Sequence, residues 1–210
     1  MQSTSTLYKT MLADDAPREV KAEIYDKNGT ASSKKTYTQD EITSCRRTAS
    51  AYSDSAPVPG GCVAATLDLE LYTTDTIPEM AMIKLFCRLN DGITTSEWIP
   101  QGVFYVDTRE VDTEAGLITL EAVDGLRKAD QVYQLEGDTG EWPRLMSTVV
   151  SEICTRCGYT LDTRTSLSST YKMEYPNDYT MREILGYIAA AHGGFWAMTG
   201  EGKLRLAQLW

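Results

Sequence analysis

Hydrophobic and polar residues alternate along much of the first half of the chain. The longest alternating stretch runs from Cys62 to Thr73, and its leucines at 67, 69 and 71 are separated by polar or aromatic side chains. Alternation with a period of two residues is typical of a β-strand that buries one face. The pattern predicts strands at 19–25, 62–73, 80–89, 93–99, 103–108 and 117–123, with a shorter one at 37–42.

Short turn sequences separate these alternating stretches. Asn28-Gly29, Asn90-Asp91-Gly92 and Glu114-Ala115-Gly116 each provide residues that favour reversal of the chain between strands. Six or seven strands at short spacing, ending near residue 127, predict an antiparallel β-barrel or sandwich.

Residues 45–61 lack a periodic apolar face. They combine Ser, Ala and two arginines with Pro57, Pro59 and two glycines, a composition that buries little apolar area. We expect a long loop here. Two accounts of it stay open, a mobile surface loop and an arm that becomes ordered only against a neighbouring subunit.

The hydrophobic period changes after about residue 130. Leu145, Val149 and Ile153 recur at intervals of four, which predicts a helix that buries one stripe. Pro143 suits the first turn of this helix and Gly158 suits its C-terminal end.

A second helix begins at Thr180. Thr180 and Glu183 form a capping box, in which each side chain can bond the backbone amide of the other. Its predicted buried face consists of Met181, Ile184, Leu185, Ile188 and Ala189. A closing hairpin at 195–198 and 203–209 follows Gly193-Gly194. We therefore expect a mostly β, α+β chain with a β-domain at 1–130 and a small α+β domain at 131–210.

Composition and charge narrow the class of protein. The 210 residues are 42% hydrophobic and 24% charged, as in a soluble globular protein, and the formal net charge is −10. Such a charge argues against general binding to nucleic acid. An 18-residue apolar run and a secretory pattern are both absent from the sequence, so we expect synthesis in a cytoplasm without membrane insertion. The apolar end at Trp210 suggests a fragment of a longer protein.

The cysteines and the sole histidine are the first candidates for chemistry. Cys154-x-x-Cys157 lacks a second pair of zinc ligands, and both thiols fall near the end of a predicted helix, so core thiols are favoured over a metal or redox site. Five cysteines, an odd number, favour free thiols. His192 lies in the last turn of a helix, where capping of carbonyl groups is favoured over general-base catalysis.

The acidic residues give a third candidate. Asp107, Glu110, Asp112 and Glu114 surround a predicted hairpin tip, but their spacing does not match a calcium loop, and a solvated hairpin is favoured. Nucleotide-binding glycine motifs do not occur in the sequence. We expect no catalytic, cofactor-binding or metal residues and no cofactor.

Three segments carry a resemblance to a known family. They are IP-x-G-x-F-x-V at 99–106 with A-x-D-x-L at 122–126, the strand at 60–69, and the helix at 179–189 with the strand at 202–206. Their order resembles the N-terminal region of tail-tip hub proteins of long-tailed bacteriophages, commonly encoded by prophages of Gram-positive bacteria. The chain departs from that family by stopping before the second barrel that completes the ring.

The resemblance implies a virion structural protein without catalytic residues. It implies a baseplate hub, a ring of three subunits that joins the distal tail protein to the tip and lets the tape-measure protein and DNA pass. Such a protein is made in the cytoplasm of a bacterial host that carries the prophage, and ends up in the phage tail. The main alternative is a β-module that binds host-surface carbohydrate, for which an aromatic-lined groove would be the evidence. An enzyme ranks third, and would need a cleft with two carboxylates of shifted pKa.

Overall fold

The computed structural model describes residues 4–52, 58–134 and 140–209. The chain forms two compact units, one of residues 1–48 and 66–124 and the other of residues 49–65 and 125–210. The predicted fold class, mostly β with an α+β composition, is confirmed. The division into domains at 1–130 and 131–210 stays a prediction.

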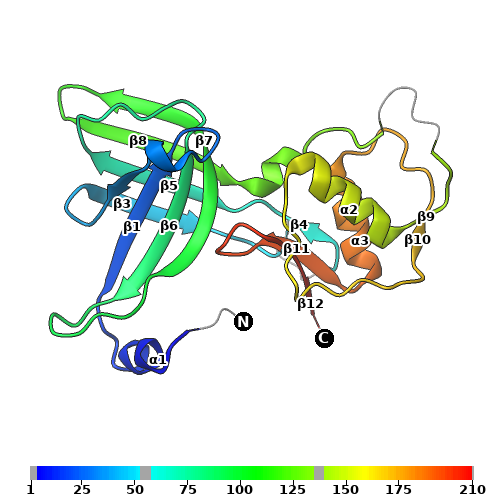
Figure 1. Ribbon diagram of the computed structural model, residues 1–210, viewed down its shortest axis with the longest axis horizontal. Helices are drawn as coiled ribbons and strands as arrows, with labels where there is room; N and C mark the ends of the chain where they lie inside the picture. The colour runs from blue at the N-terminus through cyan, green and yellow to red at the C-terminus, as the bar shows by residue number, and fades with distance from the viewer. Residues whose placement is uncertain (1–3, 53–57, 135–139, 210) are drawn as a thin grey trace. The chain divides into compact units, whose positions relative to one another are not determined.

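The first unit is one antiparallel sheet of seven strands that curls into a half-barrel (Figure 1). Its order is β2-β1-β6-β7-β8-β5-β3. The strands are β1 (Arg18–Tyr25), β2 (Lys35–Tyr37), β3 (Ile42–Thr48), β5 (Thr66–Tyr72), β6 (Met82–Leu89), β7 (Ile99–Asp112) and β8 (Leu117–Asp124). The two edge strands, β2 and β3, follow each other in sequence, and the Ile42 amide donates to the Thr38 carbonyl at 2.8 Å in the turn between them.

The alternating leucines form the core of this sheet. Leu67, Leu69 and Leu71 of β5 are at most 1% exposed, and Ile83 and Leu120 on other strands are fully buried. The register between β7 and β8 shifts between Val106 and Thr108, which marks a β-bulge. Beyond it β7 continues to Asp112 with exposed side chains.

A short helix, α1 (Thr6–Ala13), precedes the sheet and is capped by the Ser5 hydroxyl, which accepts from the Tyr8 amide. The 3-10 turn η1 (Ala31–Ser33) lies in the loop after β1. A second 3-10 turn, η2 (Gly125–Ala129), begins the longer segment of the second unit.

The second unit packs two helices with small sheets. The helices are α2 (Met146–Cys157) and α3 (Met181–Ala191). One sheet has the order β12-β11-β4 and consists of β4 (Gly61–Cys62), β11 (Gly194–Met198) and β12 (Leu204–Gln208). The other sheet pairs β9 (Arg144–Leu145) with β10 (Lys172–Met173). The buried face predicted for the second helix is confirmed at all five positions. The capping box of Thr180 and Glu183 and the left-handed C-cap at Gly158 are also confirmed.

The prediction of a loop over 45–61 is wrong at both ends. Residues up to Thr48 belong to β3, where Cys45 pairs with Leu69, and Gly61 belongs to β4, which pairs in parallel with β11. Residues 53–57 lie outside the described part of the chain. The described residues on either side belong to the second unit of the same chain.

Four other predictions need correction. The strand expected over 37–42 is instead the turn between β2 and β3, since β2 ends at Tyr37 and β3 begins at Ile42. The strand expected over 62–73 is interrupted at 63–65, because residues 61–62 pair with β11 while Thr66 starts the pairing with β8. The strand expected over 93–99 is instead a turn, in which Asp91 accepts hydrogen bonds from the amides of Ile93 and Thr94. Pro143 does not start a helix, since it precedes β9 and the helix α2 begins only at Met146.

Candidate functional site

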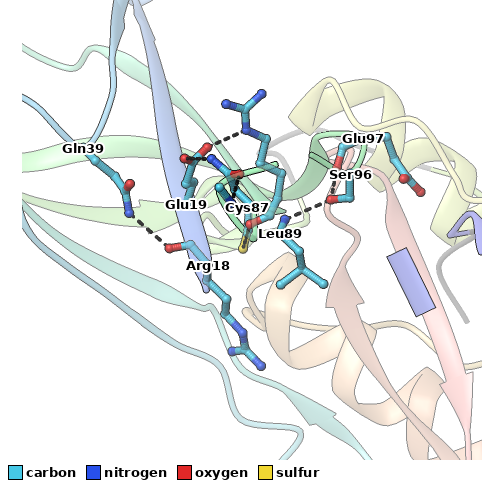
Figure 2. A network of polar contacts seen from close by, with 10 residues as sticks. Arg18, Glu19, Gln39, Cys87, Leu89, Ser96 and Glu97 are labelled. Atoms are coloured by element: carbon cyan, nitrogen blue, oxygen red, sulfur yellow. Dashed lines mark hydrogen bonds and ion pairs between the residues drawn. The ribbon is translucent and has the colours of Figure 1, made fainter. Parts of the chain in front are cut away.

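A network of polar side chains covers the end of the sheet where β1 begins and β6 ends (Figure 2). The Glu19 carboxylate accepts a hydrogen bond from Arg88 Nε at 2.6 Å and one from Asn90 Nδ2 at 2.5 Å. The hydrogen bonds from Asn90 and Arg88 hold the pKa of the Glu19 carboxyl below its ordinary value. Glu19 is therefore ionised and fully partnered at neutral pH, which suits a structural or recognition role better than proton transfer.

Trp98 lies beside this ion pair. Its ring centre is 4.4 Å from the Arg88 guanidinium carbon and 5.0 Å from the Lys21 ammonium nitrogen, within the range of cation–π attraction. A small cavity of about 240 Å³ opens here, lined by Glu19, Val20, Thr38, Gln39, Asp40, Arg88 and Trp98. This surface places a Trp ring against an Arg side chain, two residue types that are enriched at protein interfaces.

The loop from β6 to β7 is fixed to the same end of the sheet. Ser96 Oγ accepts from the Leu89 amide at 2.9 Å, and the Glu97 carboxylate accepts from both the amide and the hydroxyl of Ser5, each at 2.6 Å. Glu97 thereby ties the start of α1 to this loop. Ile93 at the tip of the loop is 95% exposed, so an apolar side chain projects from an otherwise ordered turn.

The acidic candidates lie at the β7–β8 hairpin. Asp107, Glu110, Asp112 and Glu114 are all exposed, and Asp112 Oδ1 accepts from the amides of Glu114 and Ala115 at 3.0 and 2.9 Å. A group of three or more His, Cys, Asp or Glu that could hold a metal ion is not found among the described residues, which include all four acids. The geometry is that of a turn closed by Asp112.

Cys154 and Cys157 are buried in the core of the second unit, 8% and 7% exposed. Burial raises the pKa of the Cys154 thiol to about 11 and also raises that of Cys157. Cys157 Sγ is 3.8 Å from Met181 Sδ, a packing contact between α2 and α3. The prediction that these are core thiols is confirmed.

His192 is the C-cap residue of α3. Its Nδ1 lies 2.8 Å from the carbonyl oxygen of Ile188, and its Nε2 accepts a hydrogen bond from the Ser168 amide at 2.9 Å. The prediction that the ring caps a helix carbonyl is confirmed. Its bond to Ser168, 24 residues earlier, had no signal in the sequence.

The second unit also carries a cluster of aromatic rings. Trp142 makes edge contacts with Tyr133 and Tyr175 at centroid distances of 6.3 and 5.9 Å, and Arg144 lies 4.7 Å from the Trp142 ring. Next to it is a cavity of about 490 Å³ lined by Tyr133, Arg144, Thr148, Ser151, Glu152, Thr155 and Arg156. Glu152 accepts from Tyr133 Oη and, at 3.2 Å, from Arg144 Nη1. Tyr133 is the sole ring among these lining residues, so the cavity is not an aromatic-lined groove.

Sequence patterns did not identify the network of Glu19, Arg88 and Trp98. Glu19 and Arg88 occupy polar positions of the alternating pattern in two strands, which is also where unpartnered surface charges lie. The pairing of β1 with β6, which sets Glu19 opposite Arg88, links residues 69 positions apart.

A helix long and apolar enough to span a membrane is not found in the described part of the chain.

Comparisons with known proteins place the fold. Neither a protein-family model nor a curated protein matches the sequence. Among solved structures, the 43 kDa tail protein of prophage MuSo2 from Shewanella oneidensis is similar over 92% of this chain and 56% of its own, with a TM-score of 0.60 and 14% identity.

Two further structures are similar over nearly the whole of this chain. Prophage tail protein gp18 from Listeria monocytogenes matches 90% of this chain and 50% of its own, with a TM-score of 0.55 and 8% identity. The tail protein from Neisseria meningitidis matches 89% and 50%, with a TM-score of 0.53 and 11% identity. The chain therefore shares the fold of part of these tail proteins and spans about half of their length.

Proposed function

We propose that the chain is a structural component of a phage or prophage tail. The observation that carries the proposal is the match of both units, over about nine tenths of the chain, to tail proteins from three bacteria. The outward surface of the first unit supports it, since Glu19 and Arg88 neutralise each other beside Trp98 and leave a surface suited to binding a protein partner.

The more detailed proposal is a baseplate hub. In it the full-length protein self-associates as a trimer, contacts the distal tail protein above and the tip below, and lets the tape-measure protein pass. Because this chain spans about half of its structural neighbours, the ring would need residues beyond the 210. Size-exclusion chromatography with light scattering of the full-length protein tests this point: a trimer supports the hub, and a stable monomer at micromolar concentration contradicts it.

The location in the virion has a direct test. The prophage is induced in the strain that encodes the protein, and intact phage particles are purified. Mass spectrometry and immunogold electron microscopy of these particles then locate the protein. We expect the protein in purified particles, with gold at the tail tip. Its presence in the lysate but absence from intact tails would overturn the proposal. Gold particles distributed along the tail tube would support a structural role in the tail but contradict the hub position.

The charge of the first unit supports passage of DNA rather than binding of DNA. This unit carries 11 Lys and Arg against 19 Asp and Glu, which leaves it strongly negative. A negative wall repels the phosphate backbone. We expect no measurable binding of double-stranded DNA at low salt, and appreciable affinity would count against a conduit role.

A second candidate function is carbohydrate binding by the second unit. Its support is the set of tyrosines that stand 41–52% exposed on this unit, namely Tyr171, Tyr175, Tyr179 and Tyr187. Sugars stack on exposed aromatic rings. Binding to purified host cell-wall polysaccharide, lost on substitution of Tyr179 and Tyr187 by Ala, would favour this candidate. Equal binding by that variant would reject it.

A further inference from the structure

We propose that His192 is a pH-sensitive latch that holds the segment 166–171 against the end of α3. The inference rests on the contacts of one imidazole ring in the second unit and does not depend on the tail assignment. The first step concerns the ring's tautomer. The Ile188 carbonyl, 2.8 Å from Nδ1, can only accept a hydrogen bond, so Nδ1 carries the proton. Nε2 is then unprotonated, and it accepts from the Ser168 amide at 2.9 Å.

The second step concerns the segment that this bond holds. Within it, Ser168 Oγ lies 3.1 Å from Thr170 Oγ1 and accepts from the Thr170 amide, and the Tyr171 ring lies 5.1 Å from the imidazole. Residues of the segment line part of a cavity of about 480 Å³, whose lining is Pro59, Ser166, Leu167, Ser168, Tyr171, Ala190, Ala191, His192, Gly193 and Gln208. Ser168 is the residue through which the middle of the segment is bonded to α3.

The third step is the effect of a proton. A protonated imidazole donates from both nitrogens. Nε2–H and the Ser168 N–H would then face each other, so the hydrogen bond is lost and the Ser168 amide needs another acceptor. Histidine is the side chain that ordinarily gains its charge within pH 5–8, and His192 is the sole histidine of the chain.

The described residues that line the cavity beside the ring carry no carboxylate. From the segment 166–171 the titratable group that faces the imidazole is the Tyr171 phenol; the residues that α3, β11, β12 and the chain around Pro59 contribute to the cavity are uncharged. A carboxylate beside the ring would stabilise the charged form in place, and the described lining has none. Protonation is therefore expected to free the Ser168 amide and to loosen the middle of the segment, while the Tyr171 carbonyl still accepts from the Met146 amide.

The experiment uses the 210-residue chain labelled with ¹⁵N. Long-range ¹H–¹⁵N spectra report the tautomer at pH 7.5, and amide exchange from pH 7.5 to 5.0 reports the protection factor of Ser168. The matched control amide is that of Asp162, which donates to the Leu204 carbonyl at 2.8 Å upstream of the same segment. We expect the Nδ1–H tautomer and a fall of at least about 10-fold in Ser168 protection relative to Asp162.

The variant His192→Gln replaces the imidazole while keeping a polar side chain. In it, the ratio of Ser168 to Asp162 protection should no longer change with pH. An Nε2–H tautomer, an unchanged ratio in the wild-type protein, or an equal fall of both amides would each overturn the latch. The tautomer is measured on the wild-type chain, so the proposal stays testable if the variant does not fold.

Discussion

The indole Nε1 of Trp196 donates a hydrogen bond of 2.7 Å to the carbonyl oxygen of Leu185, and both residues are fully buried. This bond joins β11 to α3 at the centre of the second unit's core. Trp196→Phe removes the donor and leaves space beside the helix, so we expect a loss of about 2–4 kcal/mol in the free energy of unfolding. Urea denaturation measures it. Tyr72→Phe, at a ring that is 61% exposed, should change stability by less than about 0.5 kcal/mol.

Gly186 in α3 lies against the backbone of Gly60. A Cβ at position 186 would lie 2.9 Å from the Gly60 carbonyl oxygen, closer than side chains normally approach. A Gly→Ala change inside a helix ordinarily stabilises it by about 1 kcal/mol. We expect Gly186→Ala to destabilise instead, by about 1–3 kcal/mol, because the segment around Gly60 must move away. Thermal denaturation gives the sign, and a stabilised variant would contradict the close packing.

The α3 capping box provides a smaller and more local effect. Thr180 Oγ1 accepts from the Glu183 amide at 3.2 Å, and the Glu183 carboxylate accepts from the Thr180 amide at 2.8 Å. Thr180→Ala removes one half of this exchange and should cost about 1 kcal/mol of stability. Chemical denaturation measures the loss, with Thr163→Ala at an exposed loop position as control. Equal stability of the two variants would show that the box contributes nothing.

The ion pair of Glu19 and Arg88 predicts a pH dependence of stability. Because the hydrogen bonds from Asn90 and Arg88 lower the pKa of Glu19 in the folded state, the ionised form stabilises the fold above the unfolded pKa. That contribution is lost as pH falls through the folded pKa. The wild-type protein should therefore exceed Glu19→Gln in stability at pH 7, and the difference should shrink below about pH 4.5. Denaturation at pH 7 and pH 3 measures it, with Glu110→Gln in the exposed hairpin as the matched control.

Thiol reactivity should separate the buried Cys154 and Cys157 from Cys62. Burial raises the pKa of Cys154 and Cys157, so the reactive thiolate is scarce there. We expect alkylation by iodoacetamide at pH 8 to be at least about 10-fold slower at these two residues than at the half-buried Cys62. Peptide mass spectrometry over time gives the rates. Similar rates at all three positions would indicate that the second unit opens readily.

Local signals in the sequence predicted the local structure well. The capping box, the glycine at 158 and the apolar stripe of α3 each involve residues a few positions apart, and all agree with the structure. The strand ends were less predictable, because pairing partners decide them. Cys62 and Thr66 read as one strand in sequence, yet one neighbours β11 and the other β8.

The candidate site shows the same limit. The helix end at His192 was predictable from the helix pattern, but its bond to Ser168 depends on how a distant segment folds back. Glu19 and Arg88 meet only because β1 pairs with β6. Side chains brought together by non-local pairing leave no periodic signal, so the network beside Trp98 could not be found from spacing alone.

The parallel pairing of β4 with β11 sets an order on biosynthesis. Gly61 and Cys62 precede their pairing partners Phe195 and Trp196 by about 130 residues in the sequence. At ordinary elongation rates the ribosome needs roughly 7–26 s to synthesise that length. During that interval the first unit can complete its sheet through Asp124, while the nascent β4 still lacks the strand that will cover it. The second unit is thus assembled last, around a strand that was synthesised early.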